Sequence, residues 1–228
     1  ANRNAAPARD DVVAELVDED QEDDADAEAP APDEGIRTDC DEDAEELERA
    51  DQLEQGVDVV LLGLASTDLL YFAAGYLNAP GVMFTASHNP AQYNGLKACL
   101  SGAKPIGKDT GLDEIRDTAE RVLKGEGPDA ASERGSVADM DLLDAFVDHV
   151  LSFVDISKFR KLKVVADTAN GMGGLVVPAV LGHVDVSLEI LYGELDGTFP
   201  NHPANPIEPE NIVDLQKKVR ETGADLGV

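Results

Sequence analysis

The segment GVMFTASHNPAQYNGLKACL, residues 81–100, places a polar stretch between two apolar runs. The runs 81–84 and 96–100 have the length of buried strands, whereas residues 85–95 are too polar to lie in a core. The Asn94–Gly95 pair before the second run is typical of a tight turn. The segment therefore predicts a strand, an exposed loop, a turn and a returning strand.

The loop carries a hydroxyl at Ser87, an imidazole at His88 and an amide at Asn89, and the returning strand carries the ammonium of Lys97. Side chains of sequence neighbours usually diverge, and no G-x-S-x-G elbow surrounds the serine, so a hydrolytic Ser–His pair is disfavoured. A phosphoserine fits the same groups better, because loop N–H groups, the imidazole, the ammonium and a divalent cation can balance its charge. The alternative is an ordinary polar loop without chemistry.

Four strings resemble motifs of the α-D-phosphohexomutase family, in the family's order. They are ASTD at 65–68, TASHNP at 85–90 with YNG at 93–95 and Lys97, ADTANG at 166–171, and NHPANP at 201–206. The resemblance is to the phosphomannomutase/phosphoglucomutase branch and runs from about Gly56 to the C-terminus. It implies that hexose 1-phosphate and hexose 6-phosphate are interconverted through a phosphoserine and a bisphosphate intermediate.

The same resemblance implies a role for each residue of the loop. Ser87 would be the phosphorylated catalytic residue, and His88 and Lys97 would be catalytic residues that position groups or carry protons. Asn89 and Asn94 would bind the substrate, a phosphorylated hexose. The implied cofactors are Mg²⁺, which Ser87 would bind through its phosphate, and a hexose 1,6-bisphosphate activator.

The end of the chain also carries an expectation from this resemblance. In the family, a strand like 224–228 leads into an Asp-Gly-Asp-x-Asp-Arg loop whose carboxylates bind Mg²⁺, and that loop is not in the sequence. We therefore expect an incomplete portion of the enzyme that is inactive by itself. The C-terminal domains that it lacks would lie on a longer or a separate chain.

Composition limits the other possibilities. The 228 residues carry 18 basic and 47 acidic side chains, a net charge of −29, which disfavours nucleic acid as a partner. Cys40 and Cys99 lie far apart without metal-ligand spacing, which indicates a reducing compartment. The sequence has neither a long apolar run nor a recognisable signal peptide, so we expect no membrane partner and a cytoplasmic location.

The fold class that the pattern predicts is α/β, with a mixed sheet in each unit and helices on its faces. We expect an acidic, disordered segment at 1–43, a unit like domain I of the family at 44–154, and a truncated unit like domain II at 155–228. The expected strands are 57–62, 81–84, 96–100, 162–166, 187–192 and 224–228. The expected helices are 43–55, 67–75, 110–124, 140–153, 175–181 and 208–222, and 125–138 is expected to be a polar loop.

A function of another class also fits this sequence. The acidic residues are concentrated at the start, where 22 of the 47 lie within the first 55 positions. A non-catalytic acidic interaction module that keeps a mutase-like fold is therefore the alternative to the enzyme.

Deletion of residues 1–43 tests the first of these expectations. Such an apolar-poor segment cannot offset its ordering entropy by burial, so its loss is expected to change the free energy of unfolding by less than about 0.5 kcal/mol. Urea denaturation of the two proteins measures the difference. A clearly larger loss of stability would show that the segment completes the first unit.

Overall fold

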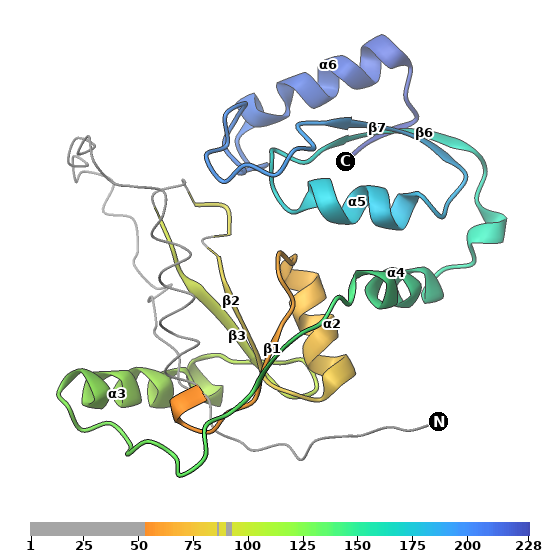
Figure 1. Ribbon diagram of the computed structural model, residues 1–228. Coiled ribbons are helices and arrows are strands. Elements are labelled where there is room, and N and C mark those ends of the chain that lie inside the picture. The colour runs from red at the N-terminus through yellow and green to blue at the C-terminus, as the bar shows by residue number, and fades with distance from the viewer. Residues whose placement is uncertain (1–52, 86, 90–92) are drawn as a thin grey trace, which may run out of the picture. The chain divides into compact units, whose positions relative to one another are not determined.

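The computed structural model describes residues 53–85, 87–89 and 93–228 (Figure 1). The acidic segment 1–43 and most of the helix expected at 43–55 lie outside these residues. The chain divides into two compact units, one formed by 62–105 with 140–228 and the other, in its described part, by 53–61 with 106–139. No helix among the described residues combines the length and apolar character that crossing a membrane requires.

An antiparallel hairpin forms the first sheet of the larger unit. Strand β2 (Gly81–Phe84) pairs with β3 (Leu96–Leu100), and the short β4 (Lys104–Pro105) pairs with the other side of β3. Gly81 lies opposite Cys99, and Phe84 lies opposite Leu96. The two strands that the apolar runs predict are therefore confirmed to the residue.

Helix α2 (Thr67–Leu77) packs on this hairpin. Its N-cap is Ser66, as predicted, and the Ser66 hydroxyl accepts a hydrogen bond from the Leu69 N–H at 3.2 Å. Leu70 and Ala74 of the helix form a buried cluster with Cys99 of β3. Burial raises the pKa of the Cys99 thiol above its usual value.

A second core cluster joins α2 to helix α4 (Leu143–Ser152), through Leu69, Ala73, Leu142 and Phe146. We expected His149, on the other side of α4, to be a solvated surface residue. It is exposed, but its ring centre lies 5.0 Å from that of Phe72 and 4.8 Å from that of Phe153. The ring therefore belongs to an aromatic cluster instead of standing free in water.

The second sheet of this unit is fully parallel, with strand order β7-β6-β8. Its strands are β6 (Leu162–Asp167), β7 (Val186–Leu191) and β8 (Leu226–Gly227). Helices α5 (Gly173–Leu181) and α6 (Val213–Thr222) cover opposite faces, as Figure 1 shows. Short 3₁₀ helices at Ile156–Lys158 and Pro209–Ile212 precede β6 and α6.

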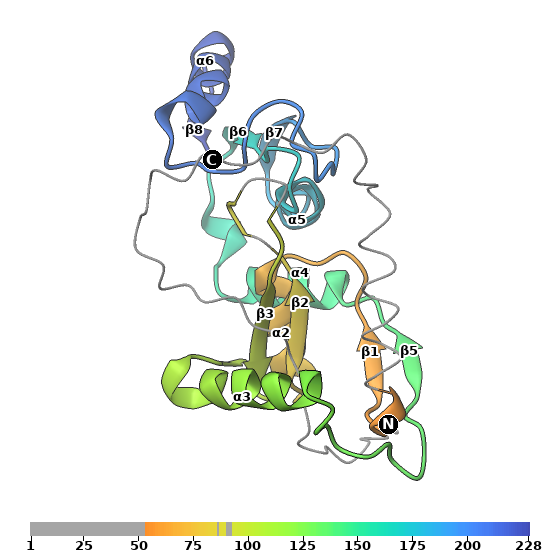
Figure 2. The ribbon, with the colours of Figure 1, turned by 90° about the vertical axis from the view of Figure 1, so that its left-hand side faces the viewer.

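The smaller unit departs from the prediction in its strands. Strand β1 (Val59–Leu61) pairs in parallel with β5 (Val137–Asp139), side by side in Figure 2, although we expected 125–138 to be a polar loop. The Asp58 carboxylate holds the two segments together by accepting hydrogen bonds from the Ser136 N–H and hydroxyl, at 2.9 and 2.7 Å. The run 57–62 was expected to be buried, but a two-stranded sheet covers little surface and Val60 is 40% exposed.

Helix α3 (Leu112–Leu123) of the same unit also differs from the prediction. A capping box at Thr110 was expected, but the N-cap is Gly111. The Thr110 hydroxyl instead accepts a hydrogen bond from the Gly107 N–H at 2.7 Å and closes the 3₁₀ turn Lys108–Thr110. The apolar stripe of α3 was expected to face a core, yet among the described residues none of its side chains is buried.

The start of α5 is shaped by the close approach of two backbone segments. A Cβ atom on Gly174 would lie 2.2 Å from the carbonyl oxygen of Gly193, so only glycine fits there. This agrees with the tight strand-to-helix packing expected for the small-residue turn. Because the helix begins at Gly173, earlier than expected, Pro178 lies in its second turn and not in its first.

Gly174→Ala is therefore expected to lower the free energy of unfolding by about 1–3 kcal/mol, the usual cost of overpacking. Gly197→Ala is the matched control, because a Cβ atom on Gly197 would meet nothing within 4 Å. Urea denaturation of both variants measures the difference. Equal stability of the two would show that the turn can shift to make room.

Candidate functional site

Ser87 has the most unusual backbone in the loop between β2 and β3. It adopts the left-handed conformation, with φ of 54°, and its side chain is exposed. A non-glycine residue in this region is uncommon and carries strain. The Ser87 N–H donates to the Thr85 Oγ1 at 3.0 Å, which ties the loop to the end of β2.

The Ser87 hydroxyl meets the neighbouring imidazole. The distance between Ser87 Oγ and His88 Nδ1 is 3.0 Å, so our expectation that these side chains diverge is wrong. The left-handed serine backbone turns both side chains to the same side of the loop. Among the described residues, no side chain holds the other nitrogen of the His88 ring, so the pair lacks the orienting group of a hydrolytic triad.

The Asn94–Gly95 pair does not form the tight turn that we predicted. A type I′ turn needs positive φ at both residues, and neither has it. The Asn94 Oδ1 instead accepts from the Gly95 N–H at 2.8 Å. The Gly95 carbonyl accepts from the Thr85 N–H at 2.9 Å, which extends the hairpin ladder beyond Phe84.

The remaining loop residues differ in exposure. Asn89 and Asn94 are exposed, whereas Lys97 is half-buried on β3, opposite Met83. The period of two places Lys97 on the same face of the hairpin as Cys99, the face that packs on α2. Within the described part of the chain, no hydrogen bond or ion pair joins Lys97 to Ser87 or His88. The structure thus brings Ser87 and His88 into contact and leaves Lys97 on the adjacent strand.

No group of three or more His, Cys, Asp or Glu side chains is arranged to hold a metal ion in residues 53–85, 87–89 and 93–228. The acceptor oxygens for a cation in the loop would have to come from a phosphate on Ser87.

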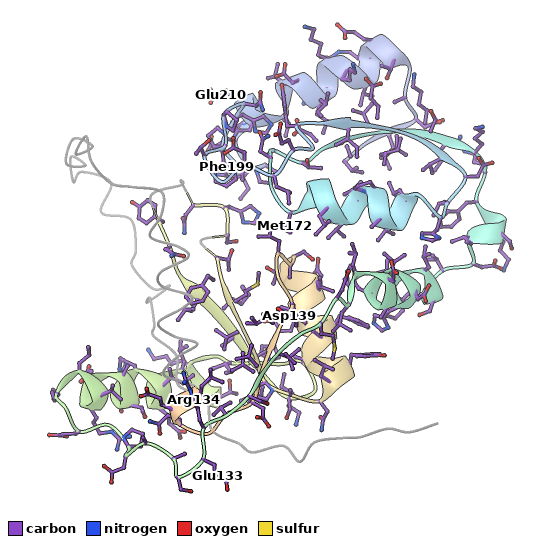
Figure 3. All side chains as sticks on the ribbon, in the orientation of Figure 1. Glu133, Arg134, Asp139, Met172, Phe199 and Glu210 are labelled. Carbon is purple, nitrogen blue, oxygen red and sulfur yellow. The ribbon has the colours of Figure 1, made fainter. Side chains whose placement is uncertain are left out.

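The carboxyl edge of the second sheet collects the two other motif strings. The Asp167 carboxylate lies 3.1 and 3.2 Å from the His202 Nε2, and the Asn170 Oδ1 accepts from the Asn201 Nδ2 at 2.8 Å. We interpreted His202 as structural, which agrees with this contact, but the sequence did not predict its partner. The polar residues that directly follow the apolar run 162–166 were the available signal. Figure 3 shows Met172 and Phe199 at the same edge.

Tyr192, just beyond β7, completes this edge. Its hydroxyl donates to the Asp214 Oδ2 at 2.6 Å, and its ring stands edge-on to that of His202 at 5.4 Å. The hydrogen bond to Asp214, with a smaller effect of burial, raises the pKa of Tyr192 to about 12. The phenol therefore stays a donor at neutral pH.

Two family models match the chain. That of phosphoglucomutase/phosphomannomutase alpha/beta/alpha domain I matches residues 44–125, and that of domain II matches residues 144–228. Together they take in most of the chain, including the serine loop and the Asp167 edge. The chain belongs to the phosphoglucomutase/phosphomannomutase family.

Relatives and solved structures in this family agree in extent. A phosphohexose mutase of Xanthomonas campestris pv. campestris is 40% identical over 174 residues, which are 76% of this chain and 38% of that protein. A phosphomannomutase of Salmonella montevideo is 40% identical over 182 residues, 76% of this chain and 39% of its own. The crystal structure of a phosphoglucomutase/phosphomannomutase family protein from Burkholderia thailandensis matches with a TM-score of 0.64 at 31% identity, covering 77% of this chain and 38% of that one.

These figures fix how far the family comparison reaches. The chain spans about two fifths of the length of the relatives that it matches. The mixed α/β architecture of the described residues is that of the family's domains I and II.

Asp214→Asn is expected to lower the pKa of Tyr192 from about 12 toward the ordinary value near 10. The hydrogen bond stabilises the fold fully below about pH 10, and this contribution is lost as the pH rises through the folded pKa. Spectrophotometric titration of tyrosinate, with Tyr192→Phe to assign the transition, measures the shift. Asp185→Asn, which changes a carboxylate remote from Tyr192, should leave it in place. An unchanged Tyr192 transition in Asp214→Asn would contradict the assigned cause.

Proposed function

We propose that this chain is part of a phosphohexomutase that interconverts hexose 1-phosphate and hexose 6-phosphate through a phosphoserine at Ser87. The names of the relatives support the reaction class. The contact between the Ser87 hydroxyl and the His88 ring, in an exposed loop within the matched domain I, carries the proposal. Within the proposal, residues 44–154 form the unit with the phosphoserine loop, and 155–228 belong to the second unit.

The reaction would begin with transfer of the serine phosphoryl group. The bond between Ser87 Oγ and phosphorus breaks while a sugar hydroxyl oxygen forms a bond to the phosphorus. The hydroxyl proton leaves to a base, for which Lys97 is the candidate once it is neutral. The serine oxygen leaves as an alkoxide, and a protonated His88, 3.0 Å away, can give it a proton. The product of this step is the hexose bisphosphate.

The second half of the reaction reverses these steps from the other end of the sugar. The bisphosphate reorients, its other phosphoryl group passes back to Ser87, and the isomeric monophosphate is released. His88 then acts as the base that accepts the Ser87 proton. The exposed amides of Asn89 and Asn94 can donate hydrogen bonds to sugar or phosphate oxygens during both halves.

Mg²⁺ is part of the proposal through the chemistry that it supplies. When bound, it neutralises the negative charge on the transferring phosphoryl group. This chain would contribute phosphate oxygens on Ser87, since its described residues offer no cluster of three ligands.

Mass analysis of the protein purified from its native cells tests the proposal. We expect one phosphate, mapped to Ser87, and its loss in Ser87→Ala expressed in the same cells. Ser187→Ala is the matched control, because Ser187 is an exposed serine on β7, and it should keep the phosphate. Mutase activity of the native protein should fall below detection in Ser87→Ala only.

His88→Ala is expected to keep the phosphoserine site but to slow transfer by about 10²–10⁴-fold, the usual contribution of a general acid or base. Phosphate on another residue with Ser87 unmodified, or full activity in Ser87→Ala, would contradict the proposal. An unphosphorylated, inactive protein would favour the acidic interaction module.

A further inference from the structure

Asp167 and His202 form the most deeply buried charged pair that the described residues contain. Their side chains are 7% and 15% exposed, whereas the other ion pairs lie on open surface. Removing an unpaired charge from water is costly, so each side chain depends on the other for compensation. The reaction proposed for Ser87 uses neither residue.

The ring of His202 has an acceptor at each nitrogen. The Nδ1 lies 2.9 Å from the Pro203 carbonyl oxygen, which can only accept. The Nε2 faces both oxygens of the Asp167 carboxylate. Both contacts are hydrogen bonds with an ionised carboxylate only when the ring carries a proton on each nitrogen. The arrangement is therefore that of an imidazolium between a carbonyl and a carboxylate.

This ring is not placed for general base or metal-ligand chemistry. Both roles need a nitrogen with a free lone pair directed at a ligand, and each nitrogen of His202 is engaged within the protein. What the pair can do is hold two segments together. It links the end of β6 to the loop at 201–206, which comes from beyond β7.

Neighbouring contacts fix the same two segments. The Asn170 Nδ2 donates to the Glu194 carbonyl at 2.9 Å, and the Asp196 N–H donates to the Asn170 carbonyl at 2.9 Å. Ala169 and Asn170 both have left-handed backbones, with φ of 47° and 60°. Such conformations persist only where the surroundings impose them. The loop is thus held over the sheet edge by side chains, against the backbone's own preference.

The position of this edge gives the pair its significance. The chain passes from β6 to β7 on one side and returns past β6 to β8 on the other, so the strand order reverses next to β6. In open parallel sheets, ligands bind outside the carboxyl ends of the strands at such a point. The Asp167 N–H also donates to the Val228 carbonyl at 2.8 Å, which connects the pair to the end of β8.

We propose that Asp167 and His202 are positioning residues, which clasp the loop 193–206 to the carboxyl ends of β6 and β8 and so shape a ligand-binding edge on the second sheet. The clasp requires a doubly protonated ring opposite the carboxylate. It does not depend on the reaction proposed for Ser87.

Amide hydrogen exchange measures the clasp directly. In Asp167→Ala and His202→Ala, exchange at Asn170 and Asp196 is expected to become at least about tenfold faster, because their hydrogen bonds join the two segments. His183→Ala, which removes an exposed imidazole after α5, is the control and should leave both rates unchanged. Amides of the β2–β3 hairpin report any general loss of stability in the same samples.

Asp167→Asn separates the hydrogen bond from the charge. An asparagine can still accept from the Ala169 N–H and can donate to a neutral His202 Nε2, so it should keep exchange at Asn170 and Asp196 within about threefold of the wild type. The ¹⁵N resonances of the His202 ring should then show two protonated nitrogens in the wild type and one in Asp167→Asn. A merely space-filling pair would not change this spectrum.

Three results would overturn the inference. They are a singly protonated His202 in the wild type, exchange at Asn170 and Asp196 that is unchanged in both alanine variants, and loss of protection in Asp167→Asn equal to that in Asp167→Ala. If the alanine variants speed exchange in the hairpin as much as in the loop, the ring spectra of the wild type and Asp167→Asn decide between the outcomes.

Discussion

The contact between helix α2 and the β2–β3 hairpin supports everything that the serine loop does. Leu70 and Ala74 of the helix meet Cys99 in a buried cluster, and a Cβ atom on Gly81 would come within 2.9 Å of the Leu70 side chain. The helix can approach β2 this closely only because that position lacks a side chain. The packed hairpin gives the loop two fixed ends, which is how an exposed loop can hold a defined geometry.

The elements that the sequence predicted best are those whose signals are local and strong. The apolar runs at 81–84 and 96–100 became strands with the predicted bounds, and Ser66 capped the predicted helix. The predicted family was confirmed as well. In each case, several neighbouring residues indicated the same result, and no distant contact was needed to decide it.

The errors have a common physical origin in non-local or backbone effects. Strand β5 forms because Asp58 binds Ser136, a partner 78 positions away. Asn94–Gly95 fits a turn by composition, but the turn lies instead at Ser87–His88, where the serine backbone is left-handed. The same conformation produced the Ser87–His88 contact that side-chain statistics disfavour. The partner of His202 was likewise invisible, because a contact across 35 residues leaves no periodic pattern.

The left-handed backbone of Ser87 has a consequence for how the chain evolves. At this φ of 54°, an L-residue is about 1–2 kcal/mol less favourable than in the right-handed region, whereas glycine is at ease. Selection for stability alone would favour glycine here, and glycine has no hydroxyl. The serine therefore marks a position where the fold accepts lower stability for a chemical group, and other sites in the chain must compensate for that loss.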